Sequence, residues 1–365
     1  MKRKRASYLL FASLASVFVL LFPASSVTNS EKLTTTVKVD CTKGDEINKA
    51  LLSNLQAQKL TIEITGMCHE NVVVTRDGVT LHGTDPANDG IQAVANTEVT
   101  DAALWVRSAR LVTVENLTLT GGFSGLLASN ANLPVMVITN CRLMGNNTFG
   151  LHLQNSVANA ADTTFESPVN SVPVGLFIGS RLGCTHCTLT APASGVTPAI
   201  NVVNSTALFF NQSTLTGGPV RAEGSSVTIS DSSIDVSALN VPSVNSISET
   251  ALILTRVQIT GRLFFGQGSN AALNAVTQST LTGQPNQANF GSHVVVGSAG
   301  QPPPGGPPNI NSSLGPFDLN NFANLVLSQG STIDGDLVCR SGSDAFCSNP
   351  AGVLGATNCG KCPKP

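Results

Sequence analysis

The chain has 365 residues, a formal net charge of −2, and only 12% charged residues beside 33 glycines. A near-neutral chain without a basic stripe argues against nucleic acid as a partner. Residues 100 to 285 contain no convincing amphipathic helix of the kind that alternates with strands in α/β enzymes. The composition therefore favours an all-β protein stabilised by stacked apolar side chains and backbone pairing.

The first 26 residues are typical of a secretory signal peptide. A basic start, Lys2–Arg5, precedes an apolar run from Tyr8 to Phe22, and small residues at Ala24 and Ser26 suit cleavage after Ser26. An uncleaved membrane anchor is the alternative, but the run is short for a span of ~20 residues. No later stretch is apolar enough to cross a membrane. We expect an exported protein, periplasmic or extracellular, in a compartment that permits disulfides.

Residues 27 to 58 are expected to form an N-terminal strand, at Thr34–Val39, and a short capping helix, at Asp45–Gln56. Asp45 is placed to cap the helix N-terminus. The predicted apolar face of the helix comprises Ile47, Leu51, Leu52 and Leu55. Such a helix would cover the open end of a β-sheet protein, where an unpaired strand edge promotes aggregation.

The next segment carries a family motif. An apolar strand leads into Gly66-Met-Cys-His-Glu70, a second strand follows, and Asp77-Gly-Val-Thr-Leu-His-Gly83 closes the segment. This order resembles the opening coils of the pectin-lyase-like right-handed β-helices; Cys68 stands where the family has tyrosine, and Glu70 matches the family's glutamate. The resemblance implies a right-handed, single-stranded parallel β-helix over roughly residues 35 to 285. It implies no single chemistry, because that superfamily contains lyases, hydrolases, esterases, epimerases and members without known activity.

A short motif, a polar residue with alternating apolar positions on either side, occurs in eight copies at intervals of 19 to 26 residues. The polar residues are Asn116, Asn140, Asp162, His186, Gln212, Asp231, Arg256 and Gln278. Alternation by two on both sides of a turn is strand periodicity, and self-similarity at this period indicates a solenoid. A third short strand precedes each copy of the motif. We therefore predict a parallel β-helix over residues 59–300, with about 22–24 residues and three strands per coil.

Residues 301–317 are expected to form a loop, because the run Gln301-Pro-Pro-Pro-Gly-Gly-Pro-Pro308 has few N–H groups to donate to a sheet. The strand pattern then resumes, so residues 318–365 are expected to hold the final coil or coils and a cysteine-rich C-terminal cap. The whole is interpreted as one elongated domain.

Nine cysteines suit a disulfide framework. Cys41 and Cys68 flank the capping helix and are plausible partners. Four more lie near the C-terminus and can pair in three ways that the sequence leaves open. They are Cys339, Cys347, Cys359 and Cys362. Disulfides would then stabilise both ends of the chain's fold.

Cys184-Thr-His-Cys187 allows a redox or zinc site. Both cysteines fall on inward positions, however, which favours buried apolar residues or a local disulfide. Cys141 is also inward and lies two coils from Cys187, about 9.6 Å away along the axis, so it is the candidate unpaired cysteine. No metal site and no cofactor are expected.

The best candidate for ligand binding is the outward column on the first strand of each coil. Aromatic side chains there could stack on sugar rings, and an arginine could meet a carboxylate or sulfate. The column is predicted to comprise Trp105, Leu127, His152, Phe177, Asn201, Arg221, Asn240 and Phe264. The alternative is that loops or the C-terminal segment cover these residues as a secondary core.

Catalysis would require suitably placed carboxylates in addition to such a column. Glycoside hydrolysis needs two carboxylates about 5 to 9.5 Å apart, and calcium-dependent lyase chemistry needs clustered carboxylates beside a base. The column offers no carboxylate. The leading hypothesis is therefore an exported, non-catalytic binding or surface scaffold for a polysaccharide or cell-surface component. The alternative is a polysaccharide lyase, hydrolase or esterase with an unfamiliar site around His152 and Arg221.

Threonine is frequent at two outward positions of the repeat, as in Thr118/Thr120, Thr188/Thr190, Thr214/Thr216 and Thr280/Thr282. Such flat arrays resemble those of ice-binding solenoids. Here Arg142, Met144 and Glu166 are among the residues that interrupt the array, and threonine is a favoured exposed strand residue in general. Ice binding therefore remains a minor alternative.

Overall fold

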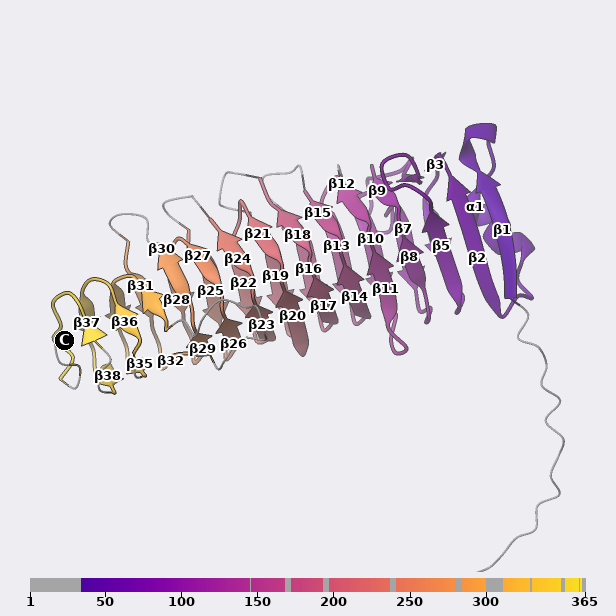
Figure 1. The fold of residues 1–365 in the computed structure, drawn as a ribbon. Helices are drawn as coiled ribbons and strands as arrows, with labels where there is room; N and C mark the ends of the chain where they lie inside the picture. Colours follow the sequence, from indigo (N-terminus) through magenta and orange to yellow (C-terminus); the bar gives the residue numbers. More distant parts are fainter. Residues whose placement is uncertain are drawn as a thin grey trace, which may run out of the picture.

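The structure is a computed structural model that describes residues 34–144, 146–167, 172–192, 197–236, 241–279, 284–299, 311–328, 330–348, 352–360 and 362. Three parallel sheets run along one axis in these residues (Figure 1). We call them sheets A, B and C. The chain passes from C to A to B within each coil and then returns to C one coil further on, as in β7, β8 and β9 followed by β10. The predicted parallel β-helix is confirmed.

The strands are short, and each pairs with the equivalent strands of the neighbouring coils. Sheet A comprises β1 (Thr34–Asp40), β2 (Lys59–Thr65), β5 (Val79–Gly83), β8 (Thr113–Glu115), β11 (Met136–Thr139), β14 (Val157–Ala161), β17 (Arg181–Thr185), β20 (Ala207–Asn211), β23 (Ser226–Ser230), β26 (Ala251–Thr255), β29 (Asn270–Asn274), β32 (His293–Gly297), β35 (Asn324–Leu327) and β38 (Asp344–Cys347). Sheet B comprises β3 (Met67–His69), β6 (Gly90–Gln92), β9 (Thr118–Thr120), β12 (Arg142–Met144), β15 (Thr164–Glu166), β18 (Thr188–Thr190), β21 (Thr214–Thr216), β24 (Ser233–Asp235), β27 (Gln258–Thr260), β30 (Thr277–Ser279), β33 (Ser313–Leu314), β36 (Thr332–Ile333) and β39 (Gly352–Val353). Sheet C comprises β4 (Val72–Val74), β7 (Leu104–Arg107), β10 (Ser124–Ser129), β13 (Phe149–Gln154), β16 (Gly175–Ile178), β19 (Ile200–Val203), β22 (Val220–Glu223), β25 (Val244–Ile247), β28 (Leu263–Phe265), β31 (Asn286–Ala288), β34 (Phe317–Leu319) and β37 (Leu337–Cys339).

The interior is filled by ladders of like side chains. On sheet B, Leu119, Leu143, Phe165, Leu189 and Leu215 stack in register, and each is at most 2% exposed. These are the apolar positions that the repeat predicts three residues after each polar turn residue. Alternation along a strand therefore sends every second side chain into the core and leaves the others outside.

The polar residue of the repeated motif forms the turn from sheet A to sheet B. In the first seven copies its φ lies between 49° and 54°, a left-handed conformation that asparagine and aspartate adopt most readily among residues other than glycine. The eighth copy differs from the prediction, because the left-handed turn residue is Ala275 and not Gln278. Gln278 instead occupies the inward position paired with Ile259.

Gln278 can lie inside because its amide is satisfied there. Its Nε2 donates to Asn286 Oδ1 over 2.7 Å, and Asn286 Nδ2 donates to Gln278 Oε1 over 2.8 Å. An inward-facing, half-buried amide that finds such a partner avoids most of the cost of losing water. The repeat pattern therefore failed at the eighth copy, whose predicted inward residue, Leu281, lies outside the described residues.

A ladder of hydroxyl groups lines the turn from sheet C to sheet A. The backbone N–H of Ser156 donates to Ser180 Oγ, and that of Ser180 donates to Ser205 Oγ, over 3.2 and 3.1 Å. Each hydroxyl donates in turn to a nearby carbonyl, as Ser180 Oγ does to Ile178 O. Serine thus satisfies backbone groups in the dry interior of the turn.

The N-terminal end is covered by a 3₁₀ turn, Cys41–Lys43, and by helix α1, Ile47–Ser53. Ile47, Ala50 and Leu51 are buried, but Leu52 and Leu55 are 70% and 65% exposed, so the predicted apolar face was too wide. The helix is capped by Glu70 rather than by Asp45. Glu70 accepts hydrogen bonds from the backbone N–H groups of Ile47 and Asn48 over 2.6 and 3.0 Å.

Four disulfides stabilise the chain. Cys41–Cys68 is confirmed, and Cys184–Cys187 forms the local disulfide that was one of the alternatives, with Cα atoms 5.9 Å apart. The C-terminal pairs are Cys339–Cys359 and Cys347–Cys362.

Cys141 is free, as predicted, and buried. Burial raises the pKa of its thiol to about 11, so the group stays protonated.

The β-helix continues beyond residue 300. The loop expected at 301–317 ends earlier, since Ser313–Leu314 already forms β33 and pairs with β30 and β36. Residues 301–310 and the predicted signal peptide lie outside the described residues. Among the described helices none is long and apolar enough to cross a membrane.

Candidate functional site

The outward column of sheet C is continuous in register over the described strands. It comprises Val73, Trp105, Leu127, His152, Leu176, Asn201, Arg221, Asn245, Phe264, Gln287, Asp318 and Val338. Five of the six residues proposed for ligand binding therefore share this column. The sixth, Phe177, does not.

Phe177 points into the core and is 1% exposed, so its predicted outward position was wrong. His152 pairs with Leu176, one residue earlier. Gly175 explains the shift, because a Cβ on Gly175 would come within 2.7 Å of Cζ in the Phe177 ring. Glycine leaves the interior space that the phenyl ring fills. The column also continues from Arg221 to Asn245 rather than to Asn240, which lies outside the described residues.

The column is closed at two neighbouring strands, β10 and β13. Leu127 is 3% exposed and His152 is 6% exposed, although both point away from the core. Trp105 is half-buried: its Nε1 donates to Ser129 Oγ over 2.9 Å, and the Arg107 guanidinium lies 5.1 Å from its ring centroid. These residues form the small secondary core that the sequence left open as an alternative.

His152 is isolated within this core. The Phe149 ring lies 5.0 Å from the imidazole, and neither ring nitrogen has a hydrogen-bond partner in the described part of the chain. Burial lowers the pKa of His152 to about 4, because the charged form would lose its hydration. The imidazole is therefore neutral near pH 7 and shielded from any substrate on the surface.

Further along, the column is more accessible: Arg221 is exposed, and Asn201, Asn245 and Phe264 are half-buried. Asn201, Arg221, Asn245 and Phe264 occupy four consecutive strands, which span about 14 Å at 4.8 Å per step. Arg221 faces Glu223 across 3.9 Å, and the two side chains are 46% and 41% exposed. Such an exposed pair is weak, so the guanidinium stays available to a ligand.

Two amide oxygens flank this arginine. Asn201 Oδ1 and Asn245 Oδ1 are enclosed and accept no hydrogen bond within the described residues. A buried acceptor without a donor costs about 1–3 kcal/mol. A hydroxyl-bearing ligand could recover that free energy once the amides rotate toward it.

The column separates the residues that the enzyme hypothesis placed together. His152 and Arg221 are three strands apart, about 14 Å, so they cannot act on one bond. Glu223 and Asp318 are four coils apart, about 19 Å, which exceeds the separation of a glycosidase pair. No group of three or more potential metal ligands occurs among the described residues.

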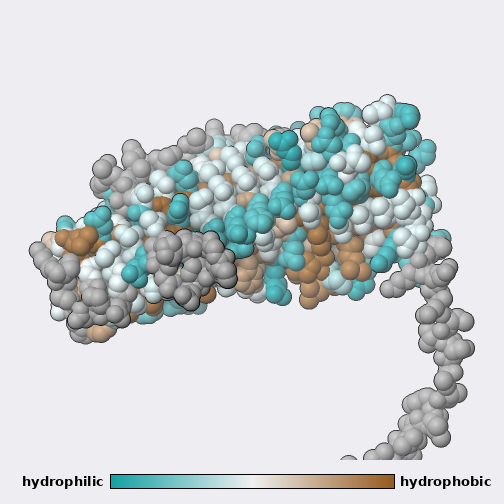
Figure 2. Space-filling view, in the orientation of Figure 1, coloured by the Kyte–Doolittle hydropathy of each residue, from teal (hydrophilic) through white to brown (hydrophobic). Residues whose placement is uncertain are grey.

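Sheet A presents an apolar outer surface. Leu133, Val137 and Phe209 are 59%, 37% and 51% exposed, and Figure 2 shows apolar side chains as a brown area near β11. Two adjoining hollows of about 310 and 300 Å³ lie here and share Asn159 and Gly183. Arg181 is the one charged side chain lining either hollow in the described residues. This surface combines exposed apolar side chains with the hydrogen-bonding side chains of Thr139, Asn159 and Thr185.

Sequence reasoning missed a third feature, a groove on the outer face of sheet B. Met144 and Glu166, which interrupt the threonine array, are two of the residues that line it. Their outward position was the signal that could have found it. Thr280 and Thr282 of the predicted array lie outside the described residues, and the array continues instead at Thr277 and Ser279.

No known protein family and no curated protein matches the chain. Among solved structures it is similar to an alginate lyase from Paenibacillus sp. str. FPU-7, with 10% identity over 89% of this chain and 99% of that chain and a TM-score of 0.35. It is also similar to the catalytic domain of a GH87 α-1,3-glucanase in complex with nigerose, with 10% identity over 90% and 70% of the two chains and a TM-score of 0.35.

The three parallel sheets define the chain as a parallel β-helix protein. This agrees with the fold-level resemblance to the pectin-lyase-like β-helices that residues 60–83 carry. A fold of this kind hosts many activities, so function has to be argued from the site.

Proposed function

We propose that the protein is an exported scaffold that binds an extended polysaccharide along the sheet C column from Asn201 to Phe264. The observation that carries the proposal is the unbroken row of an amide, a guanidinium, an amide and a phenyl ring at Asn201, Arg221, Asn245 and Phe264. Equivalent side chains one coil apart suit a polymer that lies along the helix axis.

Each side chain has a role in this binding. Arg221 pairs with a carboxylate or sulfate of the polymer through a charge-assisted hydrogen bond. The two asparagines exchange hydrogen bonds with ring hydroxyls on either side of it. Phe264, which is half-buried, offers one ring face to the apolar face of a sugar.

Binding without turnover is favoured over the enzyme alternative by the same geometry. The enzyme hypothesis relied on His152 and Arg221, which are three strands apart, and His152 is enclosed. Four disulfides support export into an oxidising compartment, together with the signal-like residues 1–26.

The test uses the chain without residues 1–26 against a panel of acidic and neutral polysaccharides, with binding and product release recorded together. Arg221→Ala should weaken binding of an acidic polymer about tenfold, the loss expected for one charge-assisted hydrogen bond. Arg142→Ala is the matched control, because Arg142 is an exposed arginine on sheet B. Equal losses in both variants, or product release by the unmodified protein, would contradict the proposal.

A further inference from the structure

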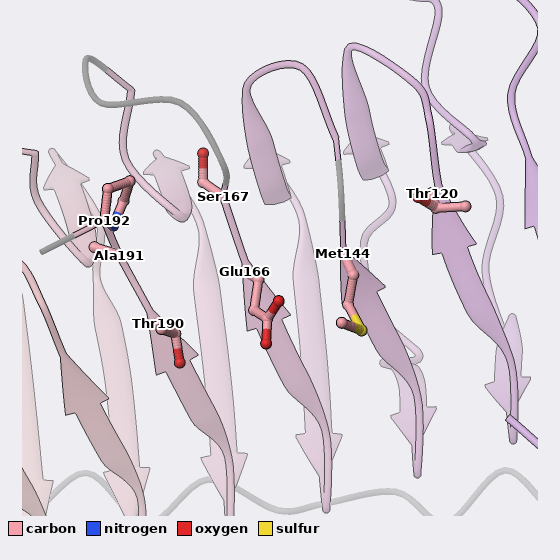
Figure 3. A pocket seen from close by; sticks show the side chains of 7 residues that line it. All are labelled: Thr120, Met144, Glu166, Ser167, Thr190, Ala191 and Pro192. Atoms are coloured by element: carbon pink, nitrogen blue, oxygen red, sulfur yellow. The ribbon is translucent and has the colours of Figure 1, made fainter. Parts of the chain in front are cut away.

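The groove on sheet B is an open cavity of about 530 Å³. Four of its lining residues come from consecutive strands, at Thr120, Met144, Glu166 and Thr190. Ser167, Ala191 and Pro192 complete it where the chain leaves the sheet (Figure 3). The groove is therefore about 14 Å long and follows the helix axis.

Strand register sets the order of groups along the groove. Met144 pairs with Thr120, and Glu166 pairs with Thr190. Leu143 pairs with Phe165, so Met144 and Glu166, which follow them, lie on neighbouring strands. Figure 3 shows the side chains of Met144, Glu166 and Thr190 on the same outward side of the sheet.

The lining combines apolar and hydroxyl groups around Glu166. Met144, Ala191 and Pro192 present carbon and sulfur, while Thr120, Thr190 and Ser167 present oxygen. A sugar ring has the matching character, with apolar faces and a rim of hydroxyls. An extended glycan can therefore place ring faces on the apolar groups and ring hydroxyls against the threonines.

Glu166 is the one charged residue among the seven that line the groove. It is half-buried, and no ion pair involves it within the described residues. The neighbouring coils toward the C-terminus place only threonine beside it, at Thr190 and then Thr216. A lone carboxylate in a groove of low charge repels uronic acids and sulfated sugars and attracts an ammonium group.

We propose that this groove binds a short chain of amino sugars whose amino groups are free, with one ammonium group against Glu166. The site does not depend on the sheet C column, which has the opposite charge preference because of Arg221. One β-helix would then hold two glycan sites on different faces.

The test is calorimetric titration of the protein with a β-1,4-linked glucosamine tetramer at millimolar concentration, beside the fully N-acetylated tetramer. The glucosamine tetramer should bind more tightly, and Glu166→Gln should weaken it about tenfold and remove the preference. Asp235→Asn is the matched control: Asp235 lies in the same outward column, three strands from Glu166, and does not line the groove. It should leave the affinity within about twofold.

Four outcomes would overturn the proposal. They are an unchanged affinity in Glu166→Gln, an equal loss in Asp235→Asn, equal binding of the two tetramers, and complete displacement by spermidine at equal concentration. Displacement by spermidine would show that the groove binds an ammonium group and does not recognise the sugar ring. A fifth outcome, loss of tetramer binding in Arg221→Ala, would place the ligand on sheet C and overturn the proposal as well.

Discussion

Replacing Phe177 with alanine tests the register of sheet C. The side chain is 1% exposed and lies in the core beside Gly175, the preceding inward residue of the same strand, which leaves room for the ring. Removing a buried phenyl ring costs about 3–5 kcal/mol in the free energy of unfolding, because the neighbours collapse only partly into the cavity. An outward position, which sequence periodicity suggested, would cost no more than about 0.5 kcal/mol.

The matched control is Leu176→Ala, the outward neighbour on the same strand, which is half-buried. Urea unfolding followed by circular dichroism gives both free energies, and the slope shows whether the unfolding remains two-state. We expect Phe177→Ala to lose at least about 2 kcal/mol more than Leu176→Ala. Equal losses below about 1 kcal/mol would refute the assignment of Phe177 to the core.

Three further predictions concern other parts of the fold. Glu70→Ala should lower the stability by about 1–2 kcal/mol in thermal unfolding, because two N–H groups of α1 lose their acceptor, while Glu70→Gln should lose less. Because the pKa of His152 is lowered to about 4, the unfolded chain binds a proton between about pH 6.5 and 4 that the folded chain does not bind. The free energy of unfolding should therefore fall by about 3 kcal/mol as the pH is lowered from 6.5 to 4. His152→Leu should make this decrease smaller. Cys141 should react with a thiol reagent only after unfolding, since it is buried and its thiol pKa is raised to about 11; rapid labelling of the native protein would contradict the burial.

The solenoid was predictable because its ladders repeat. Seven of the eight turn residues and the apolar positions around them follow from alternation alone. The eighth failed because Gln278 pairs with Asn286, and a sequence pattern cannot show that two amides satisfy each other inside. The same limit hid the hydroxyl ladder of Ser156 and Ser180, since serine is equally common in exposed turns.

The candidate site was predictable only in part. Periodicity placed Trp105, Asn201 and Arg221 outside, but it could not show that Leu127 and His152 are enclosed, because accessibility depends on which segments cover a strand. A one-residue shift also exchanged Phe177 for Leu176, which is the error that a period of two makes most easily. The C-terminal disulfide pairing required coordinates, since four cysteines allow three connectivities.

The most direct test of the central claim is a crystal structure of the protein soaked with an oligosaccharide of the acidic polymer that binds most tightly. We expect an intact ligand lying across β19, β22, β25 and β28, with a carboxylate or sulfate at Arg221 and a sugar ring against Phe264. A ligand bound on another face, or one cleaved at the sheet C column, would contradict it.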